Sequence, residues 1–302
     1  MKRPRTVRAL LEYGVKIFEE AGLSYGHGTT NALDEAAWLI LRALELPPGD
    51  INPHLDRSLD AARFAAAKSL LDQRVATRKP AAYLLHEAWL GPHRFYVDER
   101  VIVPRSFIAE LLLEKRGQSP FSLRANGVPP KRKRGLSPFL DLCTGSGCLA
   151  ILAALRFPDA HVDAVDLSDE ALQVAARNVA DYGLGNRIAL ARSDLFSALE
   201  GRTYDVIVSN PPYVKAASMR TLPDEYRKEP RMALASGADG LEHTRAILAQ
   251  AHAHLNPGGV LVVEVGHNRR ALERAFPRLA FDWPKTSAGS GFVFAIAREQ
   301  LA

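Results

Sequence analysis

The tetrapeptide Asn210-Pro211-Pro212-Tyr213 carries the side chains of this sequence best suited to gripping a planar amide or amine. It follows an apolar run, residues 204–209, that is typical of a buried strand. Two consecutive prolines supply no backbone N–H, so the strand must end there. The side-chain amide of asparagine can both donate and accept hydrogen bonds, and a tyrosine ring can stack on a planar group that the asparagine binds. The pattern indicates a site that keeps an amide or exocyclic amine flat while its nitrogen reacts. The tetrapeptide alone is equally compatible with an ordinary proline-rich turn.

A glycine-rich turn follows the first predicted strand of the same region, in Asp141-Leu142-Cys143-Thr144-Gly145-Ser146-Gly147. Glycine lets the backbone approach a ligand and accepts positive φ angles. Position 150 is alanine, so the spacing is not the dinucleotide-binding pattern, and the turn has no lysine for a phosphate loop. The turn therefore suits the amino-acid portion of a cofactor better than a phosphate.

Acidic residues follow the next two predicted strands. Asp166 lies 19 positions after Gly147, close to the spacing at which a carboxylate binds ribose hydroxyls. Asp194 precedes Leu195 after the third strand, where a carboxylate could accept from an adenine amino group. Each acidic residue alone is more simply interpreted as a helix cap or part of a solvated loop. Because ligands bind at the carboxyl ends of parallel strands, the set together predicts a nucleoside-bearing cofactor.

Strands and helices alternate from Pro138 onward, which favours a parallel sheet. Strands are predicted over 139–143, 161–166, 187–192, 204–209, 258–265 and 291–297, with a weaker one near 279–283. Helices are predicted over 148–157, 169–182, 241–255 and 269–276. Before them, helices are expected over 32–44 and 61–77, then a hairpin over 83–103 and a short helix over 107–114. The sequence predicts an α/β fold with a seven-stranded sheet in residues 138–302, a helical domain in 1–82, and a connecting β-hairpin and helix in 83–114.

Composition indicates an ordinary globular protein. The 302 residues are 47% hydrophobic and 24% charged, which leaves room for two domains and a large core. No apolar run is long enough to span a membrane, and no signal-peptide pattern follows the basic N-terminus. The two cysteines, Cys143 and Cys148, fit no metal-binding spacing. We expect a cytoplasmic protein with no metal and no membrane contact.

Residues 115–137 differ from the rest of the chain. Between positions 115 and 134 lie seven basic residues and no acidic one, so with a total of +5 the remainder sums to −2. The sequence of 115–121 recurs at 133–139 with six of seven residues identical. Such a duplicated, apolar-poor segment is expected to be disordered. It is either a passive insertion or a basic tether that contacts RNA, and we favour the first.

On these residues the chain resembles the class I S-adenosylmethionine-dependent methyltransferases that modify amide or amine nitrogens. Within them it resembles the protein-glutamine N5-methyltransferases (HemK-like), in the branch that modifies a glutamine of ribosomal large-subunit protein three. The resemblance covers nearly the whole chain except 115–137. Further markers are Gly26-His27-Gly28-Thr29 and Val103-Pro104-Arg105-Ser106. The release-factor branch carries glycine where Cys143 stands and proline where Ser106 stands.

The resemblance implies S-adenosylmethionine as the cofactor. Its carboxypropyl end would lie over Thr144–Gly147, its ribose on Asp166 and its adenine beside Asp194 and Leu195. The predicted cofactor-binding residues are Asp141, Cys143, Thr144, Gly145, Ser146, Gly147, Asp166, Asp194, Leu195 and Asn210, and the predicted catalytic residues are Asn210, Pro211, Pro212 and Tyr213. The helical N-terminal domain would recognise the protein substrate.

The predicted mechanism is positioning. The side-chain oxygen of Asn210 and the carbonyl of Pro211 would accept the two N–H groups of the amide, and Tyr213 would stack on its plane. No general base is assigned. Arg105 is a candidate for holding a loop near the cofactor, and His27 is either a substrate contact or a turn residue.

Three other functions are compatible with parts of the pattern. A release-factor glutamine methyltransferase shares the chemistry. A nucleic-acid adenine or guanine amine methyltransferase uses the same tetrapeptide but is expected to show a basic, aromatic-bearing face, whereas the chain outside 115–137 is slightly acidic. An inactive ribosome-assembly factor that binds through the basic segment would not need the cofactor pattern.

Overall fold

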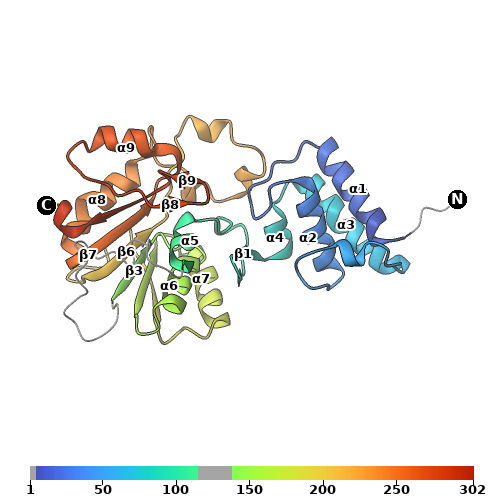
Figure 1. Cartoon of the computed structure of the whole chain (residues 1–302), viewed down its shortest axis with the longest axis horizontal. Helices are drawn as coiled ribbons and strands as arrows, with labels where there is room; N and C mark the ends of the chain where they lie inside the picture. The colour runs from blue at the N-terminus through green and yellow to red at the C-terminus, as the bar shows by residue number, and fades with distance from the viewer. Residues whose placement is uncertain (1–4, 115–137) are drawn as a thin grey trace.

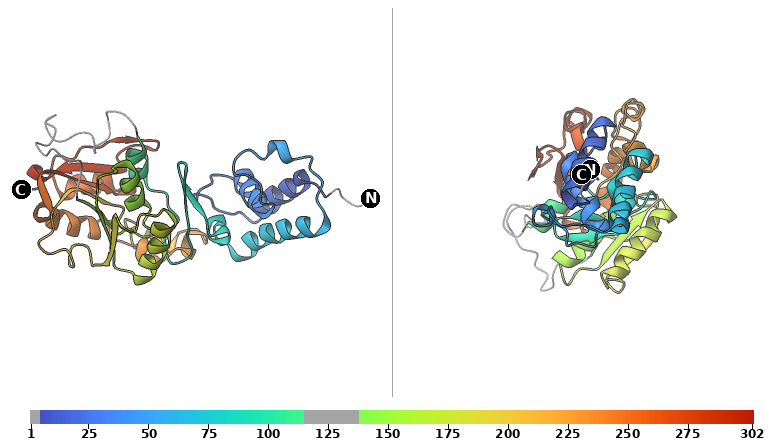
Figure 2. Two further views of the ribbon diagram at one scale, coloured as in Figure 1. Left: turned by 90° about the horizontal axis from the view of Figure 1, so that it is seen from below. Right: turned by 90° about the vertical axis from the view of Figure 1, so that its right-hand side faces the viewer.

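The protein has two lobes connected at a waist (Figures 1 and 2). A computed structural model describes residues 5–114 and 138–302. The predicted basic insertion, with its expected disorder, lies outside the described residues. The connection consists of a short β-hairpin and of a segment from the C-terminal lobe that reaches the N-terminal helices, drawn in tan in Figure 1.

The N-terminal lobe is built from α1 (Val7–Glu20), α2 (Ala32–Ala43), α3 (Ala61–Thr77) and α4 (Ala81–Leu85). The predicted helices over 32–44 and 61–77 are confirmed to within one residue. Asn31 and Asp60 cap α2 and α3, since their side chains accept from backbone N–H groups three residues on. The apolar faces of the first three helices meet in one core that includes Leu10, Leu39 and Leu71.

The connecting hairpin is shorter than predicted. Only β1 (Ala88–Leu90) and β2 (His93–Phe95) pair, and the predicted start of the hairpin is helix α4 instead. Val97, Val101 and Val103 are buried in a cluster with Ala171 and Val174 of α7 (Asp169–Asp181), so these apolar residues pack in the core without forming paired strands. Helix α5 (Phe107–Leu113) follows as predicted, with Ser106 as its cap.

The C-terminal lobe contains a mainly parallel sheet in the order β10-β7-β6-β3-β4-β5. Its strands are β3 (Phe139–Leu142), β4 (Val162–Asp166), β5 (Ile188–Arg192), β6 (Tyr204–Ser209), β7 (Leu255–Glu264) and β10 (Val293–Ala297), of which β10 is antiparallel. The prediction of seven strands is wrong for the described residues, where this sheet has six. Residues 279–283 contribute one antiparallel bridge, Asp282 to Ala295, because Pro284 follows at once and cannot donate to a further ladder bond.

Helices cover both faces of the sheet. On one face lie α5, α6 (Cys148–Arg156) and α7 (Asp169–Asp181), and on the other α8 (Glu242–His254) and α9 (Arg269–Ala275). A small hairpin of β8 (Lys285–Thr286) and β9 (Gly289–Ser290) precedes β10. The chain leaves β3 toward β4 and β5 on one side and reaches β6 and β7 on the other, so the strand order reverses between β3 and β6. Ligands of open α/β sheets bind at the carboxyl ends of the strands beside such a reversal.

Candidate active site

A cavity opens where β3, β4 and β6 end. Seven of the predicted site residues lie on its wall: Cys143, Gly145, Asp166, Asp194, Leu195, Asn210 and Pro212. Residues far apart in the chain, from the turns after four strands, are thus brought to one place. Two of them, Cys143 and Leu195, adopt left-handed backbone conformations with φ of 59° and 49°. Non-glycine residues hold such conformations only where the surroundings impose them, as at ligand sites.

Asp166 is fixed at the end of β4 by two backbone N–H groups. Its Oδ2 accepts from Gly145 at 2.9 Å and its Oδ1 from Ser168 at 3.0 Å. A carboxylate oxygen has capacity for more than one hydrogen bond, so both oxygens can still accept from a ligand in the cavity. Burial raises the pKa of Asp166. The carboxylate also joins the glycine turn after β3 to the next helix.

Asp141 does not line the cavity, although it was predicted to bind the cofactor. It is fully buried beneath the turn, where its Oδ2 accepts from the Thr144 hydroxyl at 2.6 Å and from the Ala150 N–H at 3.0 Å. Burial raises the pKa of Asp141 to about 7. Its position lets it shape the turn rather than touch a ligand.

Thr144, Ser146 and Gly147 are likewise absent from the residues that line the cavity. The Ser146 carbonyl accepts from Asn178, and a Cβ at Gly147, whose φ is +78°, would lie 3.1 Å from the Cβ of Ala175. The glycine therefore permits close packing of α6 on α7.

Asn210 lies at the boundary between the first cavity and a second one, and it lines both. Its Oδ1 is buried and has no hydrogen-bond partner among the described residues. Tyr213 lines the second cavity. The Tyr213 hydroxyl donates to Glu264 Oε1 at 3.3 Å, and its ring packs so closely on Gly266 that a Cβ there would be 2.8 Å from it. The second cavity is therefore lined both by Asn210, whose Oδ1 has no partner in the described part of the chain, and by the fixed ring of Tyr213. Pro211, which follows Asn210 in the chain, is buried.

Comparison with known proteins decides the family. A profile of the methyltransferase small domain matches residues 130–238. The chain is 54% identical over 298 residues to the ribosomal protein uL3 glutamine methyltransferase of Neisseria meningitidis serogroup B, covering 98% of this chain and 94% of that protein. It is 52% identical to the protein of the same name from Bordetella pertussis, over 98% and 96% of the two chains. It is 47% identical to that of Bradyrhizobium diazoefficiens, over 96% and 90%.

The chain belongs to the uL3 glutamine methyltransferase family. Among solved structures, the hMettl16 catalytic domain in complex with a 3'UTR hairpin is similar with a TM-score of 0.50, at 12% identity, over 82% of this chain and 86% of that one. This likeness shows a shared fold alone. The predicted family and the class I methyltransferase fold are therefore confirmed.

Two loops of this methyltransferase complete the cavities and were not predicted as site residues. Residues 100–102 from one loop and Pro230, Met232 and Ala233 from the other line the first cavity, and Tyr226 lines the second. These loops lack hydrophobic periodicity, so the sequence did not predict them as part of the site. The family marker Val103–Ser106 was the one signal close to them. The prediction that Arg105 holds a loop is confirmed: its two Nη atoms donate to Glu229 at 2.5 and 2.7 Å, directly before the cavity-lining loop.

The remaining candidates carry no separate chemistry. His27 is buried, with its ring centroid 4.3 Å from that of Tyr226, so it is not an open substrate contact. Burial raises the pKa of Cys143 and brings that of Cys148 to about 12, so neither is a thiolate at neutral pH. Within residues 5–114 and 138–302 no cluster of three His, Cys, Asp or Glu side chains is placed to hold a metal ion. In the same ranges no helix has the length and apolar character to cross a membrane.

Proposed function

We propose that this methyltransferase transfers the methyl group of S-adenosylmethionine to the side-chain amide nitrogen, N5, of a glutamine in ribosomal protein uL3. The observation that carries the proposal is the buried, unpartnered Oδ1 of Asn210 at the boundary of the two cavities. An acceptor in that position can bind an N–H group of a glutamine that enters through the second cavity, with the glutamine nitrogen facing the first cavity.

The residues of the first cavity fit S-adenosylmethionine. Asp166 keeps acceptor capacity for ribose hydroxyls, and Asp194 and Leu195 lie on the wall where adenine would bind. Cys143 and Gly145, which line the same cavity, would face the amino-acid portion. When bound, the cofactor supplies a methyl group that its sulfonium has already activated.

The protein's own contribution is to hold the glutamine amide. An amide nitrogen is a poor nucleophile because its lone pair is delocalised into the carbonyl. Asn210 Oδ1 and the Pro211 carbonyl accept the two N–H groups, and the ring of Tyr213, fixed by Glu264 and Gly266, stacks on the amide plane. Orientation of this kind contributes on the order of 7–11 kcal/mol at best.

The same acceptors stabilise the positive charge that develops on nitrogen, since the N–H groups point at fixed oxygens. The proton then leaves through the Asn210 side chain or water. Asn210 is therefore both a catalytic residue and part of the cofactor wall.

The N-terminal lobe, residues 1–82, recognises the protein substrate in this proposal, and 138–302 form the catalytic domain. A hollow on that lobe, lined by Gly28, Trp38 and Trp89, supports this role. Trp89 on its wall is 36% exposed, and Leu33, next in the chain to the lining residue Asp34, is 52% exposed. Apolar side chains exposed next to a hollow are typical of a protein-binding surface.

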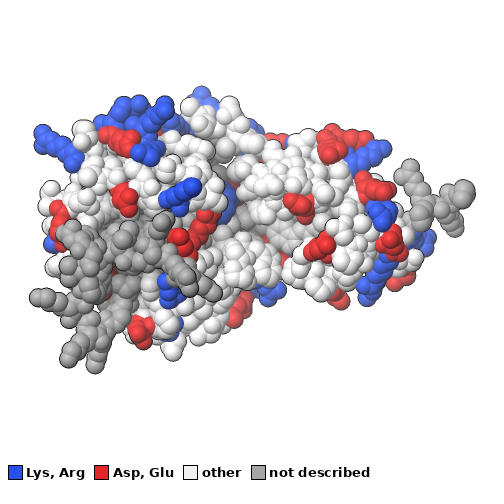
Figure 3. All heavy atoms as spheres, viewed as in Figure 1, with Lys and Arg blue, Asp and Glu red and all other residues white. Residues whose placement is uncertain are grey.

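The other two substrate classes have less support. The relatives carry the name of uL3 and not of a release factor. On the face in Figure 3, acidic and basic side chains are interspersed over the described surface, with one gathering of basic side chains over α9. A broad basic face would be expected for a nucleic-acid substrate. RNA contact through residues 115–137 stays a prediction, because they lie outside the described residues.

The proposal is tested by offering three substrates with labelled S-adenosylmethionine: uL3, a release factor and bulk nucleic acid. We expect label on uL3, and none when Asn210→Ala replaces the wild type. Label on the release factor would keep the chemistry and change the protein substrate. Label on nucleic acid alone would overturn the substrate class.

A further inference from the structure

Residues 222–230 connect the active site to the N-terminal lobe. This segment follows the Asn-Pro-Pro-Tyr turn and contains a short 3-10 helix, Tyr226–Lys228. Leu222 and Tyr226 line the second cavity, and Pro230 lines the first. In Figure 1 the segment extends from the C-terminal lobe to the blue N-terminal helices. A displacement of the N-terminal lobe would therefore move side chains on the wall of the substrate cavity.

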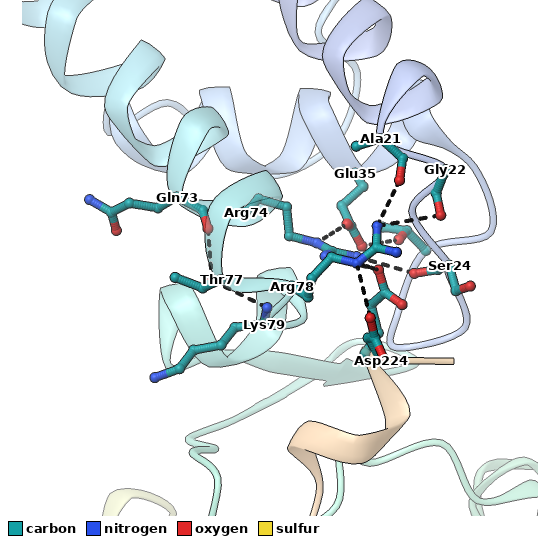
Figure 4. A network of polar contacts seen from close by, with 12 residues as sticks. Ala21, Gly22, Ser24, Glu35, Gln73, Arg74, Thr77, Arg78, Lys79 and Asp224 are labelled. Carbon is teal, nitrogen blue, oxygen red and sulfur yellow. Dashed lines mark hydrogen bonds and ion pairs between the residues drawn. The ribbon is translucent and has the colours of Figure 1, made fainter. Parts of the chain in front are cut away.

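A buried charge cluster fixes this segment to the N-terminal lobe. Arg74 of α3 is fully buried, and its Nε donates to Glu35 at 2.6 Å. Glu225 enters from the segment, with its Oε1 3.6 Å from Arg74 Nη1 and 3.4 Å from Arg78 Nε, and its side chain is 0% exposed. Figure 4 shows Arg74 and Arg78 extending from α3 toward Glu35 and Asp224. A buried carboxylate is costly unless it stays close to its cations, so the cluster restricts where the segment can lie.

The Gly26-His27 loop makes a second contact with the same segment. The Tyr226 hydroxyl donates to the Tyr25 carbonyl at 3.2 Å. Gly26 has a φ of +118°, and a Cβ on it would overlap the Tyr226 hydroxyl. The His27 ring is buried against the Tyr226 ring. The glycine is therefore required both by the backbone conformation and by the tyrosine that it faces.

The contacts continue from the segment to the wall of the substrate cavity. Glu229 Oε2 lies 3.6 Å from His27 Nε2, and the same carboxylate accepts from Arg105 and from the Val103 N–H at 2.9 Å. The Arg105 guanidinium lies 5.6 Å from the centroid of the Tyr226 ring. Arg105 and Tyr226 both line the second cavity together with Asn210.

We propose that Tyr226 and Arg105 are positioning residues of the substrate cavity, and that the Gly26-His27 loop and the Arg74–Glu225 pair of the lobe interface set their place. The N-terminal lobe is then part of the substrate site as well as a docking surface. The proposal rests on the proposed function, because the cavity is taken to receive the residues that flank the glutamine. The proposal also explains the Gly26-His27-Gly28-Thr29 marker, which has no part in cofactor binding.

The test uses a substitution and its rescue. Gly26→Ala pushes a methyl group against the Tyr226 hydroxyl, and we expect kcat/KM for uL3 to fall about tenfold or more, chiefly through KM, since small misplacements are costly at a reacting centre. Tyr226→Phe removes the overlapping atom and should itself cost only about two- to fivefold. The double variant should recover the part of the loss that comes from this overlap, while the backbone strain of alanine at a φ of +118° remains. Cofactor Kd should stay within about threefold in all three, since none of these residues lines the cofactor cavity.

A double variant no better than Gly26→Ala would overturn the proposal, because simple destabilisation is not relieved by removing a hydroxyl. If Gly26→Ala does not fold, Glu225→Gln serves instead, with Asp163→Asn as its matched control. Asp163 also pairs with an arginine, Arg202 at 2.8 Å, and accepts from the Tyr204 hydroxyl at 2.7 Å, but it lies outside both active-site cavities and outside the hollow on the N-terminal lobe. Equal KM values in these two variants would contradict the proposal. Wild-type protein that fails to methylate uL3 would instead overturn the proposed function.

Discussion

Replacing Asp166 by Asn should raise the Kd for S-adenosylmethionine, and the hydrogen bonds of Asp166 indicate by how much. Both carboxylate oxygens already accept a backbone N–H, from Gly145 and Ser168. An asparagine has one oxygen, so its –NH2 would face one of these N–H groups, and it offers no charged acceptor to the ribose. Loss of a charge-assisted hydrogen bond costs about 1.5–3 kcal/mol. This corresponds to an increase in Kd of roughly 10- to 150-fold.

The assay is isothermal titration calorimetry with S-adenosylmethionine. Asp169→Asn is the matched control, because Asp169 is an exposed residue of the same turn that pairs with Arg192 outside the cavity. Burial raises the pKa of Asp166, so its charge is lost on acidification earlier than for an exposed Asp. Wild-type affinity should therefore fall as the pH is lowered toward that pKa, and the affinity of Asp166→Asn should not. A Kd for Asp166→Asn within about threefold of the wild type would refute the assignment of this carboxylate to the ribose.

Two further substitutions test the amide site and the group beneath it. Asn210→Ala removes the buried acceptor, so methyl transfer should fall by about 10²-fold or more, with cofactor Kd changed little; near-normal turnover in a labelled-methyl assay would contradict the amide-holding role. Glu264 is fully buried, and burial raises its pKa from 4.5 to about 7. The protonated Glu264 makes its full contribution to the free energy of unfolding below pH 4.5. This contribution is lost as the pH rises through 7, which lowers the free energy of unfolding by about 3 kcal/mol. Glu264→Gln should lack this loss when urea unfolding is compared at pH 5 and pH 8, and an unchanged pH dependence would argue against the raised pKa.

The elements that carry the site could be predicted because their sequence signals are local. Short runs rich in apolar residues and followed by turn residues marked β3, β4, β5 and β6 to within one residue. The residues at their carboxyl ends then met at one cavity because parallel strands end at the same edge.

The role of Asp141 shows what the local signals left out. Side chains alternate along a strand, so Asp141 shares a face with Phe139, whose ring packs in the α6 layer, while Leu140 and Leu142 pack in the opposite layer. The carboxylate consequently reaches the Ala150 N–H under the turn and not the cavity. Motif matching placed it at the cofactor because it ignored this alternation.

The cavity-lining loops could not be predicted for a different reason. Arg105 meets Glu229, 124 residues further along the chain, and Tyr226 only in the folded protein, and their loops have no periodicity to mark them. The Gly26-His27-Gly28-Thr29 segment was given as a family marker, but the need for glycine at position 26 could not be predicted, because the tyrosine that it faces is 200 residues away in the chain. The missing seventh strand likewise depended on one proline after residue 283.

The most direct test of the account is to locate the methyl group. Purified uL3 would be incubated with the enzyme and S-adenosylmethionine, and fragment mass spectrometry would assign the modified residue. The account predicts one added methyl group on the side-chain amide of a single glutamine, absent when Asn210→Ala is used. A methyl group on a lysine, on the N-terminal amine or at any other nitrogen of uL3 would contradict the amide-holding geometry at its centre.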